Sequence, residues 1–294
     1  MKLLDFCLLL LLGALFASGF LFIRIAVPVL GPFFLMDARV ILAALVLLSW
    51  AQFKGEKVRF TGKKRHWLAL GAFNAAIPFS LLAWAELHIS SSLAAILIAT
   101  MPLFTSIISA VWLREAISFK KACGLALGLL GVAILSGLSP VELSLTHGLA
   151  ILATLGTSFS YAFGGVYIKK YFQGVPRVTL TIGNFTSAGL LLLPFALMNP
   201  PSVMPDLTTM AVVLGLVIIT SVFPYVIMFR LIETNGTTTA ASVAFLIPAF
   251  GALMGTVFLG ETINLAMLLG MGVIFSSIVL VNNINLGFNP LRAR

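Results

Sequence analysis

Long apolar segments alternate along this chain with short stretches that carry charge, proline or glycine. Each apolar segment is about 20 residues long, the length at which an α-helix crosses the hydrocarbon core of a bilayer. The pattern predicts an all-α membrane protein with ten transmembrane helices. The predicted spans are residues 3–23, 33–53, 67–85, 92–113, 119–138, 147–168, 178–198, 209–231, 238–259 and 264–283.

The first span has a second interpretation, because Lys2 and the apolar run that follows it resemble a cleaved signal peptide. We favour a transmembrane helix, since the run stays apolar as far as Ile23.

Composition agrees with a membrane protein. Hydrophobic residues make up 60% of the 294 residues and charged residues 9%, with a mean hydropathy of +1.12. Soluble domains carry about 25% charged residues. Ten spans take about 200 residues, and the remainder, divided among loops and tails, is too short for an extramembrane domain of about 50 residues or more. The sequence also lacks a G-x-x-x-x-G-K-[ST] phosphate loop, which argues against a nucleotide-binding domain.

Basic residues indicate the orientation of the helices. With ten spans, 16 of the 18 Lys and Arg residues fall on the side of the N-terminus, and only Arg24 and Arg39 fall on the other side. The positive-inside rule therefore places both termini in the cytoplasm of a multi-pass protein of the bacterial inner (plasma) membrane. The net charge of +9 would also suit a nucleic-acid partner. That interpretation does not explain why the charges alternate between loops, so we expect the lipid bilayer and no nucleic acid.

The two halves of the sequence match without a gap after a shift of 146 residues. The matches include Pro78 with Pro224, Pro102 with Pro248, Glu115 with Glu261 and Gly124 with Gly270. We therefore predict two repeats, over residues 1–140 and 141–294. Each repeat holds five spans, an odd number, so the second repeat enters the membrane upside down. Inverted repeats are typical of secondary transporters, although a repeat without a role in transport is an alternative.

Two segments resemble a known family. FASGFLFIRIAVPVLGPFFLMDARVILAALVLL and IPAFGALMGTVFLGETINLAMLLGMGVIFSSIVLV are similar to EamA-type members of the drug/metabolite transporter superfamily. Further marks are Arg39, the prolines Pro102 and Pro248, and the Leu-x-Glu endings 113–115 and 259–261.

The resemblance implies a bacterial inner-membrane carrier for amino acids, other metabolites or toxic compounds, often moved outward. It also implies a central cavity lined chiefly by helices 1, 3, 4, 6, 8 and 9. Many members carry Trp where this chain has Phe16, so stacking contacts of relatives are not transferred to that position.

Enzyme signatures are missing from the sequence. Neither H-E-x-x-H nor G-x-S-x-G occurs, and His66, His88 and His147 are scattered over three span ends. Cys7 and Cys123 lie in separate apolar runs, without the spacing of a metal site or a disulfide framework. We expect no enzyme activity, no catalytic residues, no cofactor and no metal. A membrane-embedded enzyme is the least favoured alternative.

Charged residues near the membrane offer few candidates for ion coupling. The acidic residues at predicted span ends are Asp37, Glu86, Glu115, Glu142, Asp206, Glu233 and Glu261. None is at mid-span, where proton relays usually lie. Facilitated diffusion, exchange and coupling through a boundary acid such as Glu86 therefore all stay open. Glu115 and Glu261 are expected to stabilise the N-termini of helices five and ten.

Arg39 is expected to extend to the outer interface or to pair with Asp37. Direct contact with substrate is the lesser alternative.

Small residues mark close helix packing. Gly124, Gly128 and Gly131 form one stripe, and Gly251 and Gly255 form another. Small residues at this spacing let helix backbones approach one another. We expect packing within the chain first and a homodimer interface second.

Prolines at equivalent positions suggest the location of a substrate site. A proline removes the donor for the carbonyl four residues earlier, so Pro78 frees the carbonyl of Asn74 and Pro224 that of Thr220. Pro102 and Pro248 free Ile98 and Ala244 in the same way. In lipid, such carbonyls need protein or a wet cavity. The candidate substrate-binding residues are Asn74, Phe79, Thr220, Tyr225, Phe16, Ser18, Ser158 and Tyr161. Alternatively, the prolines only kink their helices.

The sequence as a whole predicts a secondary transporter with alternating access for a small organic metabolite, most plausibly an exporter of an amino acid or a related compound. An oligomeric channel or facilitator is the main alternative. A channel would need a ring of repeated polar or charged residues, which no span offers.

Overall fold

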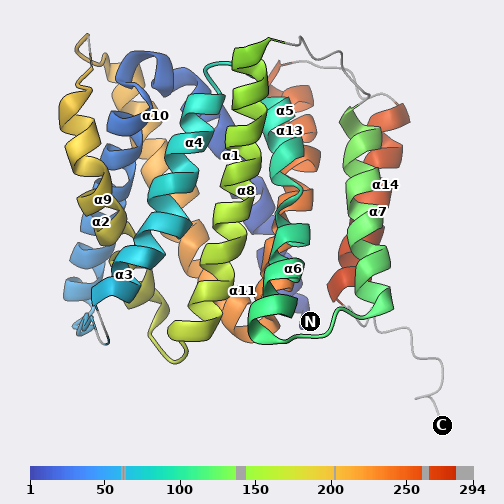
Figure 1. The fold of residues 1–294 in the computed structure, drawn as a ribbon. Coiled ribbons are helices and arrows are strands. Elements are labelled where there is room, and N and C mark those ends of the chain that lie inside the picture. The colour runs from blue at the N-terminus through green and yellow to red at the C-terminus, as the bar shows by residue number, and fades with distance from the viewer. Residues whose placement is uncertain (61, 63, 137–143, 202, 260–264, 283–294) are drawn as a thin grey trace.

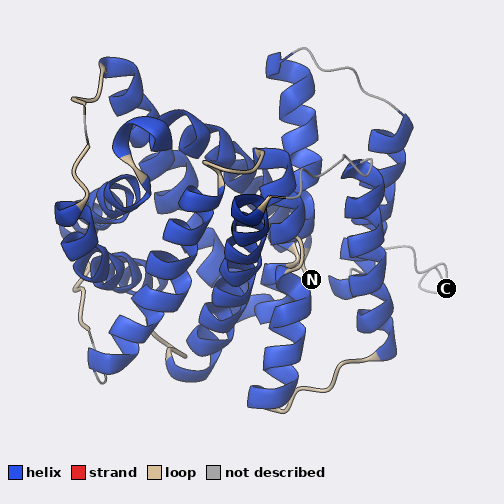
Figure 2. Cartoon of the chain, turned by 45° about the horizontal axis from the view of Figure 1, so that its top comes forward, coloured by secondary structure: helices blue, strands red, loops and turns tan. Residues whose placement is uncertain are grey.

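The computed structural model describes the chain except for residues 61, 63, 137–143, 202, 260–264 and 283–294. Every regular element among the described residues is a helix (Figure 2). The helical segments lie side by side as ten rods that run alternately up and down (Figure 1). We call the end of the bundle where α1 starts at Leu3 the N-face, and the end where α1 finishes at Leu30 the far face.

Six rods are single helices and four are interrupted. The single helices are α1 (Leu3–Leu30), α2 (Pro32–Phe53), α7 (Phe119–Ser136), α8 (Leu145–Tyr171), α9 (Arg177–Met198) and α14 (Leu265–Asn282). The interrupted rods are α3 (Lys64–Gly71), η1 (Ala72–Ala76) and α4 (Ile77–Ala85); α5 (Ser91–Ile98) and α6 (Met101–Leu113); α10 (Leu207–Val217), η2 (Ile218–Val222) and α11 (Phe223–Asn235); and α12 (Thr237–Ala241) and α13 (Val243–Leu259).

These ten rods correspond to the ten predicted spans. Among the described residues, seven rods are long and apolar enough to cross a membrane, and shorter apolar stretches occur at Thr237–Gly251 and Leu268–Val281. The predicted fold class is therefore confirmed. The predicted boundary between the repeats, at residues 140 and 141, lies outside the described residues.

Two of the interruptions are π-helical turns at equivalent positions in the repeats. The turns η1 and η2 start at Ala72 and Ile218, which are separated by the 146-residue shift of the repeat. Each turn is followed by a proline, Pro78 in α4 and Pro224 in α11. A proline cannot donate a backbone hydrogen bond and its ring clashes with the preceding turn. π-helical turns are rare, occur mostly as single turns inside α-helices, and are frequently found at functional sites. The equivalent rods of the two repeats thus each contain a wider, π-helical turn at the same position of the repeat.

The glycine stripe of α7 packs against α14 of the same chain. A Cβ on Gly124 would lie 2.7 Å from Val281, and one on Gly131 would lie 2.9 Å from Ile274. The Ser277 hydroxyl donates to the carbonyl of Gly124 at 2.6 Å, which also ties the two helices together. The intramolecular packing expected for this stripe is therefore present. Next to Gly251 no described atom lies within 4 Å of such a Cβ, so a homodimer through that surface stays a prediction.

We expect Gly71→Ala to destabilise the fold, because α3 approaches the backbone of α9 closely there. The new Cβ would lie 2.6 Å from the backbone nitrogen of Ala188 and from the side chain of Ser187. Overpacking of this kind costs about 1–3 kcal/mol. Thermal unfolding in detergent measures the loss. Gly148→Ala is the matched control, since no described atom lies within 4 Å of its Cβ position. Equal stability of the two variants would contradict the tight seam.

Candidate substrate site

A cavity of about 80 Å³ lies at the centre of the bundle. Its walls come from α1, α2, η1, α4, α5, α6, α8, η2, α11 and α13. One water molecule needs about 10–15 Å³ of such space, so the cavity has room for several waters or a small organic solute. The rods that contribute are those implied by the family resemblance, with the addition of α2, which contributes Arg39.

Most of the predicted site residues line this cavity. Those that do are Phe16, Asn74, Phe79, Tyr161, Thr220 and Tyr225. Ser18 and Ser158 do not. The Ser18 hydroxyl donates to the carbonyl of Leu15 at 2.7 Å, and that of Ser158 donates to Leu97 at 3.1 Å. Serine hydroxyls commonly bond to nearby helix backbone, and these two are consequently turned toward main chain.

The two repeats supply matching parts of the wall. Several lining residues are paired by the 146-residue shift, namely Asn74 with Thr220, Phe79 with Tyr225, Leu82 with Met228, and Met101 with Ile247. The cavity therefore lies on the pseudo-symmetry axis between the repeats.

Side chains from the other repeat bond to the carbonyls beside the two π turns. The carbonyls of Asn74 and Thr220 lose their α-helical donors because a proline stands four residues later. The Tyr225 hydroxyl donates to the carbonyl of Asn74 at 3.3 Å. Nη2 of Arg39 donates to the carbonyl of Thr220 at 3.2 Å. Each repeat thus completes the backbone hydrogen bonding of the other at the wall of the cavity.

The other two prolines also accompany breaks in their rods. Pro102 is the second residue of α6, just after the gap that separates α5 from α6. Pro248 lies inside α13, which follows the short helix α12. All four interrupted rods reach the cavity.

Arg39 lies in the interior, so the expectation that it extends to the interface or pairs with Asp37 is wrong. Its residue is only 5% exposed. Nε donates to the Ser221 hydroxyl at 2.7 Å and Nη2 to the Thr220 hydroxyl at 3.0 Å. Cζ lies 4.0 Å from the centre of the Phe79 ring. A planar guanidinium can bind both hydroxyl groups and the face of an aromatic ring. These contacts hold Arg39 in the interior instead of at the membrane interface.

Aromatic rings form much of the remaining wall. The Tyr225 ring contacts Phe16 and Phe79 edge-on, with centroids 6.0 Å apart in both pairs. Phe79 also contacts Tyr161 at 6.2 Å. The rings present flat apolar surfaces, and their tyrosine hydroxyls add polar points. Such a cavity suits a solute with an apolar body and few polar groups.

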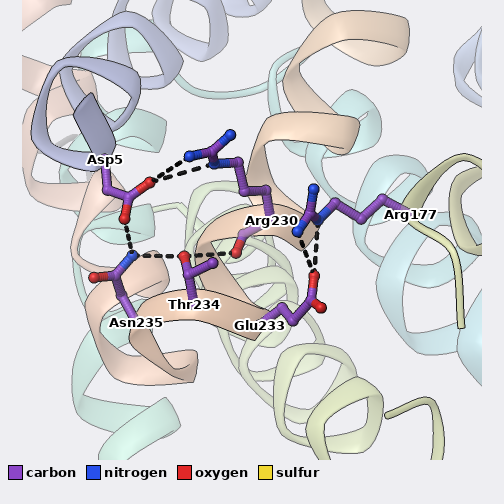
Figure 3. A network of polar contacts seen from close by, with 6 residues as sticks. All are labelled: Asp5, Arg177, Arg230, Glu233, Thr234 and Asn235. Carbon is purple, nitrogen blue, oxygen red and sulfur yellow. Dashed lines mark hydrogen bonds and ion pairs between the residues drawn. The ribbon is translucent and has the colours of Figure 1, made fainter. Parts of the chain in front are cut away.

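A polar network ties α1 and α9 to α11 at the N-face (Figure 3). Asp5 accepts from Nη2 of Arg230 and from Nδ2 of Asn235, each at 3.1 Å. Arg177 and Glu233 form an ion pair at 2.7 Å. The sequence does not predict this partnership of Asp5, although a carboxylate in an apolar run usually has a partner.

A third ion pair at the N-face joins Glu115 to Lys169 of α8. Glu115 was expected at the start of helix five, but α7 begins at Phe119 and the carboxylate pairs with Lys169 instead. Glu261 lies outside the described residues. Within the described part of the chain, all three ion pairs lie at the N-face, and two of them join the first repeat to the second.

The fold and the central cavity define a multi-pass membrane transporter, and comparison with known proteins gives its family. The family model described as "EamA-like transporter family" matches residues 4–137 and 148–283. The chain belongs to the EamA-like transporter family, within the drug/metabolite transporter superfamily. The predicted family, and the prediction that the chain is no enzyme, are therefore confirmed.

Curated relatives are similar over most of their length. The uncharacterized inner membrane transporter YedA of Escherichia coli strain K12 is 30% identical over 291 residues, which cover 93% of this chain and 91% of YedA. Protein PecM of Dickeya dadantii is 28% identical, over 74% of this chain and 73% of PecM. The crystal structure of a protein that is 17% identical in sequence aligns over 95% of this chain and 96% of its own chain, with a TM-score of 0.78. This likeness supports the fold.

We expect Asp5→Ala to destabilise the protein more than Glu233→Ala. The side chain of Asp5 is 5% exposed, and its loss removes the carboxylate that accepts from Arg230 and Asn235. Hydrogen bonds to charged groups contribute about 1.5–3 kcal/mol. Glu233 is 57% exposed, and exposed ion pairs contribute about 0–1 kcal/mol. Thermal unfolding of both variants in detergent shows which of the two is less stable. The reverse order would show that the Asp5 network adds little to stability.

Proposed function

We propose that this protein is a secondary transporter with alternating access that moves a small organic metabolite, an amino acid or a related compound, out of the cell across the bacterial inner membrane. One observation carries the proposal: the central cavity is walled by equivalent residues of both repeats. In transporters with inverted repeats the substrate site lies at the repeat interface, near the middle of the membrane, where helices are interrupted.

The interrupted rods support this mechanism. The π turns η1 and η2 and the breaks before α6 and α13 all lie in rods that reach the cavity. Helix breaks and π turns are where long helices bend. Movement of one repeat against the other therefore has bending points at the level of the solute.

The ion pairs of the N-face support the assignment of a gate. Asp5–Arg230 and Glu115–Lys169 each join the first repeat to the second. The Glu115–Lys169 pair is partly exposed, and such pairs contribute about 0–1 kcal/mol. The charged hydrogen bonds of the more buried Asp5 contribute about 1.5–3 kcal/mol, and energies of this size allow both pairs to break and re-form during a transport cycle. We place this face in the cytoplasm because most of the basic residues lie on its side. Opening toward the cytoplasm would separate these pairs.

An oligomeric channel or facilitator is the second candidate. It would need a continuous polar or charged ring, whereas the lining residues are mostly apolar and include one charged residue, Arg39. The alternating-access mechanism is therefore favoured.

Exchange across vesicle membranes tests the proposal. We expect the purified protein in liposomes to exchange a small metabolite by counterflow without ATP, measured against a panel of radiolabelled amino acids and related compounds. Asn74→Ala, Thr220→Ala and Tyr225→Ala should weaken substrate binding, because these residues line the cavity. Polar contacts within membranes average about 0.6 kcal/mol, so folding should persist.

Thr154→Ala is the control for these variants. Thr154 is buried in α8, and its hydroxyl donates to the carbonyl of Ala150 at 2.9 Å, away from the cavity. Unchanged affinity in all three cavity variants would refute the site. A strict need for ATP on this chain alone would refute the transport mechanism.

The orientation has its own test. After replacement of Cys7 and Cys123 by alanine, Met204→Cys and Gln173→Cys place one thiol in an exposed loop on each face. A membrane-impermeant maleimide should label position 204 in intact cells, and position 173 only after the membrane is disrupted. The opposite pattern would invert the proposed topology and the direction assigned to the gate.

A further inference from the structure

Arg39 is the one formally charged side chain among the residues that line the central cavity. The ion pairs of the described chain all lie at the N-face, and none includes Arg39. A buried charge is costly unless it is paired and hydrogen-bonded, and ionisable groups inside a membrane usually serve a function. The cavity therefore contains a positive charge without a carboxylate partner in contact.

Part of the guanidinium has no strong acceptor. Arginine has five N–H donors, of which Nε donates to Ser221 and Nη2 donates to both the carbonyl and the hydroxyl of Thr220. Among the described residues, Nη1 contacts the sulfur of Met36 at 4.0 Å. A thioether is a weak acceptor. Two charged N–H groups thus lack an oxygen partner among the described residues.

A second donor of the cavity wall is also unused. The side-chain nitrogen of Asn74 is buried and has no hydrogen-bond partner among the described residues. Asn74 is the repeat equivalent of Thr220, which accepts from Arg39, and both residues line the cavity. This wall therefore has donors in excess of acceptors, and a bound oxyanion would correct the imbalance.

Glu86 is the nearby carboxyl that needs to be considered. It follows α4, is fully buried and acts electrostatically on Arg39 as well as on Arg24. One of its oxygens accepts from the Ser91 hydroxyl at 3.3 Å, and no ion pair within 4.0 Å joins it to Arg39. Glu86 therefore contributes to the electrostatic potential at Arg39, but it does not provide a carboxylate in contact with Nη1.

We infer that the transported solute is a small organic monocarboxylate, whose carboxylate binds Arg39 from inside the cavity. Asn74 is the second donor to this carboxylate, and the aliphatic or aromatic body of the solute packs among Phe16, Tyr161 and Tyr225. One carboxylate matches the one cationic side chain among the described residues of the cavity wall, and charge-assisted hydrogen bonds are stronger than neutral ones. The inference rests on the proposed transport function and names the substrate class of that site.

Matched carboxylates and amides test this inference directly. The probes are phenylacetate with phenylacetamide, isovalerate with isovaleramide, and leucine with leucinamide. Binding to the detergent-solubilised protein is measured by calorimetry, and exchange of the same compounds is measured by counterflow in liposomes. We expect each carboxylate to bind about tenfold or more tightly than its amide, the ratio that corresponds to about 1.4 kcal/mol.

Two variants and a control test which residues cause the preference for carboxylates over amides. Arg39→Met should weaken carboxylate binding about tenfold or more and leave the amides largely unchanged. Arg24→Met is the control, because Arg24 donates to the carbonyls of Glu86 and Ile89 and does not line the cavity. Asn74→Asp places a carboxylate in the wall and should also abolish the preference. This second variant tests the inference even if Arg39→Met does not fold.

The outcomes separate the inference from the transport proposal. Binding of carboxylates that depends on Arg39, without counterflow, would retain the carboxylate site and reject transport. Amides that bind as tightly as carboxylates would overturn the carboxylate site, and so would the absence of binding by both classes. A preference for carboxylates that survives both Arg39→Met and Asn74→Asp would also overturn it.

Discussion

Inside a bilayer no water is at hand for a backbone group that has lost its partner, and this constraint shapes the centre of the molecule. Pro78 and Pro224 remove donors at equivalent points of the two repeats. Tyr225 and Arg39 replace them, each reaching across to the other repeat. The same hydrogen bonds that complete the interrupted helices therefore hold an aromatic ring and a guanidinium at the cavity wall, so the helix breaks and the candidate site have one physical origin.

The inverted repeat supplies equivalent residues to the cavity wall, but it does not repeat the charge. The 146-residue shift relates Phe79 to Tyr225, and it also relates Arg39 to Phe185. In the first repeat the guanidinium lies 4.0 Å from the ring of Phe79. In the second repeat the ring of Phe185 lies 4.8 Å from that of Tyr225. The two positions pack against their neighbours in the same way, yet only one carries a charge. The charge of Arg39, which lines the cavity, is therefore not repeated at the equivalent position of the second repeat.

Sequence predicted the parts of the structure that depend on periodicity and on proline chemistry. The spans, the repeat and the level of the cavity follow from apolar runs and from prolines in common register. Arg39 was misplaced because its acceptors, Ser221 and Thr220, lie more than 180 residues away in the chain and only the fold brings them near. The pairing of Asp5 with Arg230, 225 residues apart, was missed for the same reason. Most of the apolar lining could not be predicted either, since almost every helix position in a membrane protein is apolar.

The glycine seam between α7 and α14 has a consequence for how the protein is made. Most partners of Gly124, Gly128 and Gly131 are residues of the last described helix, including Ile274, Ser277 and Val281, and Gly128 also contacts Phe245 of α13. Translation proceeds from the N-terminus at about 5–20 residues per second, so α7 enters the membrane many seconds before α14 exists. During that interval its glycine face borders lipid or the insertion machinery. The bundle is therefore completed only at the end of synthesis, when α14 packs against the glycine face of α7.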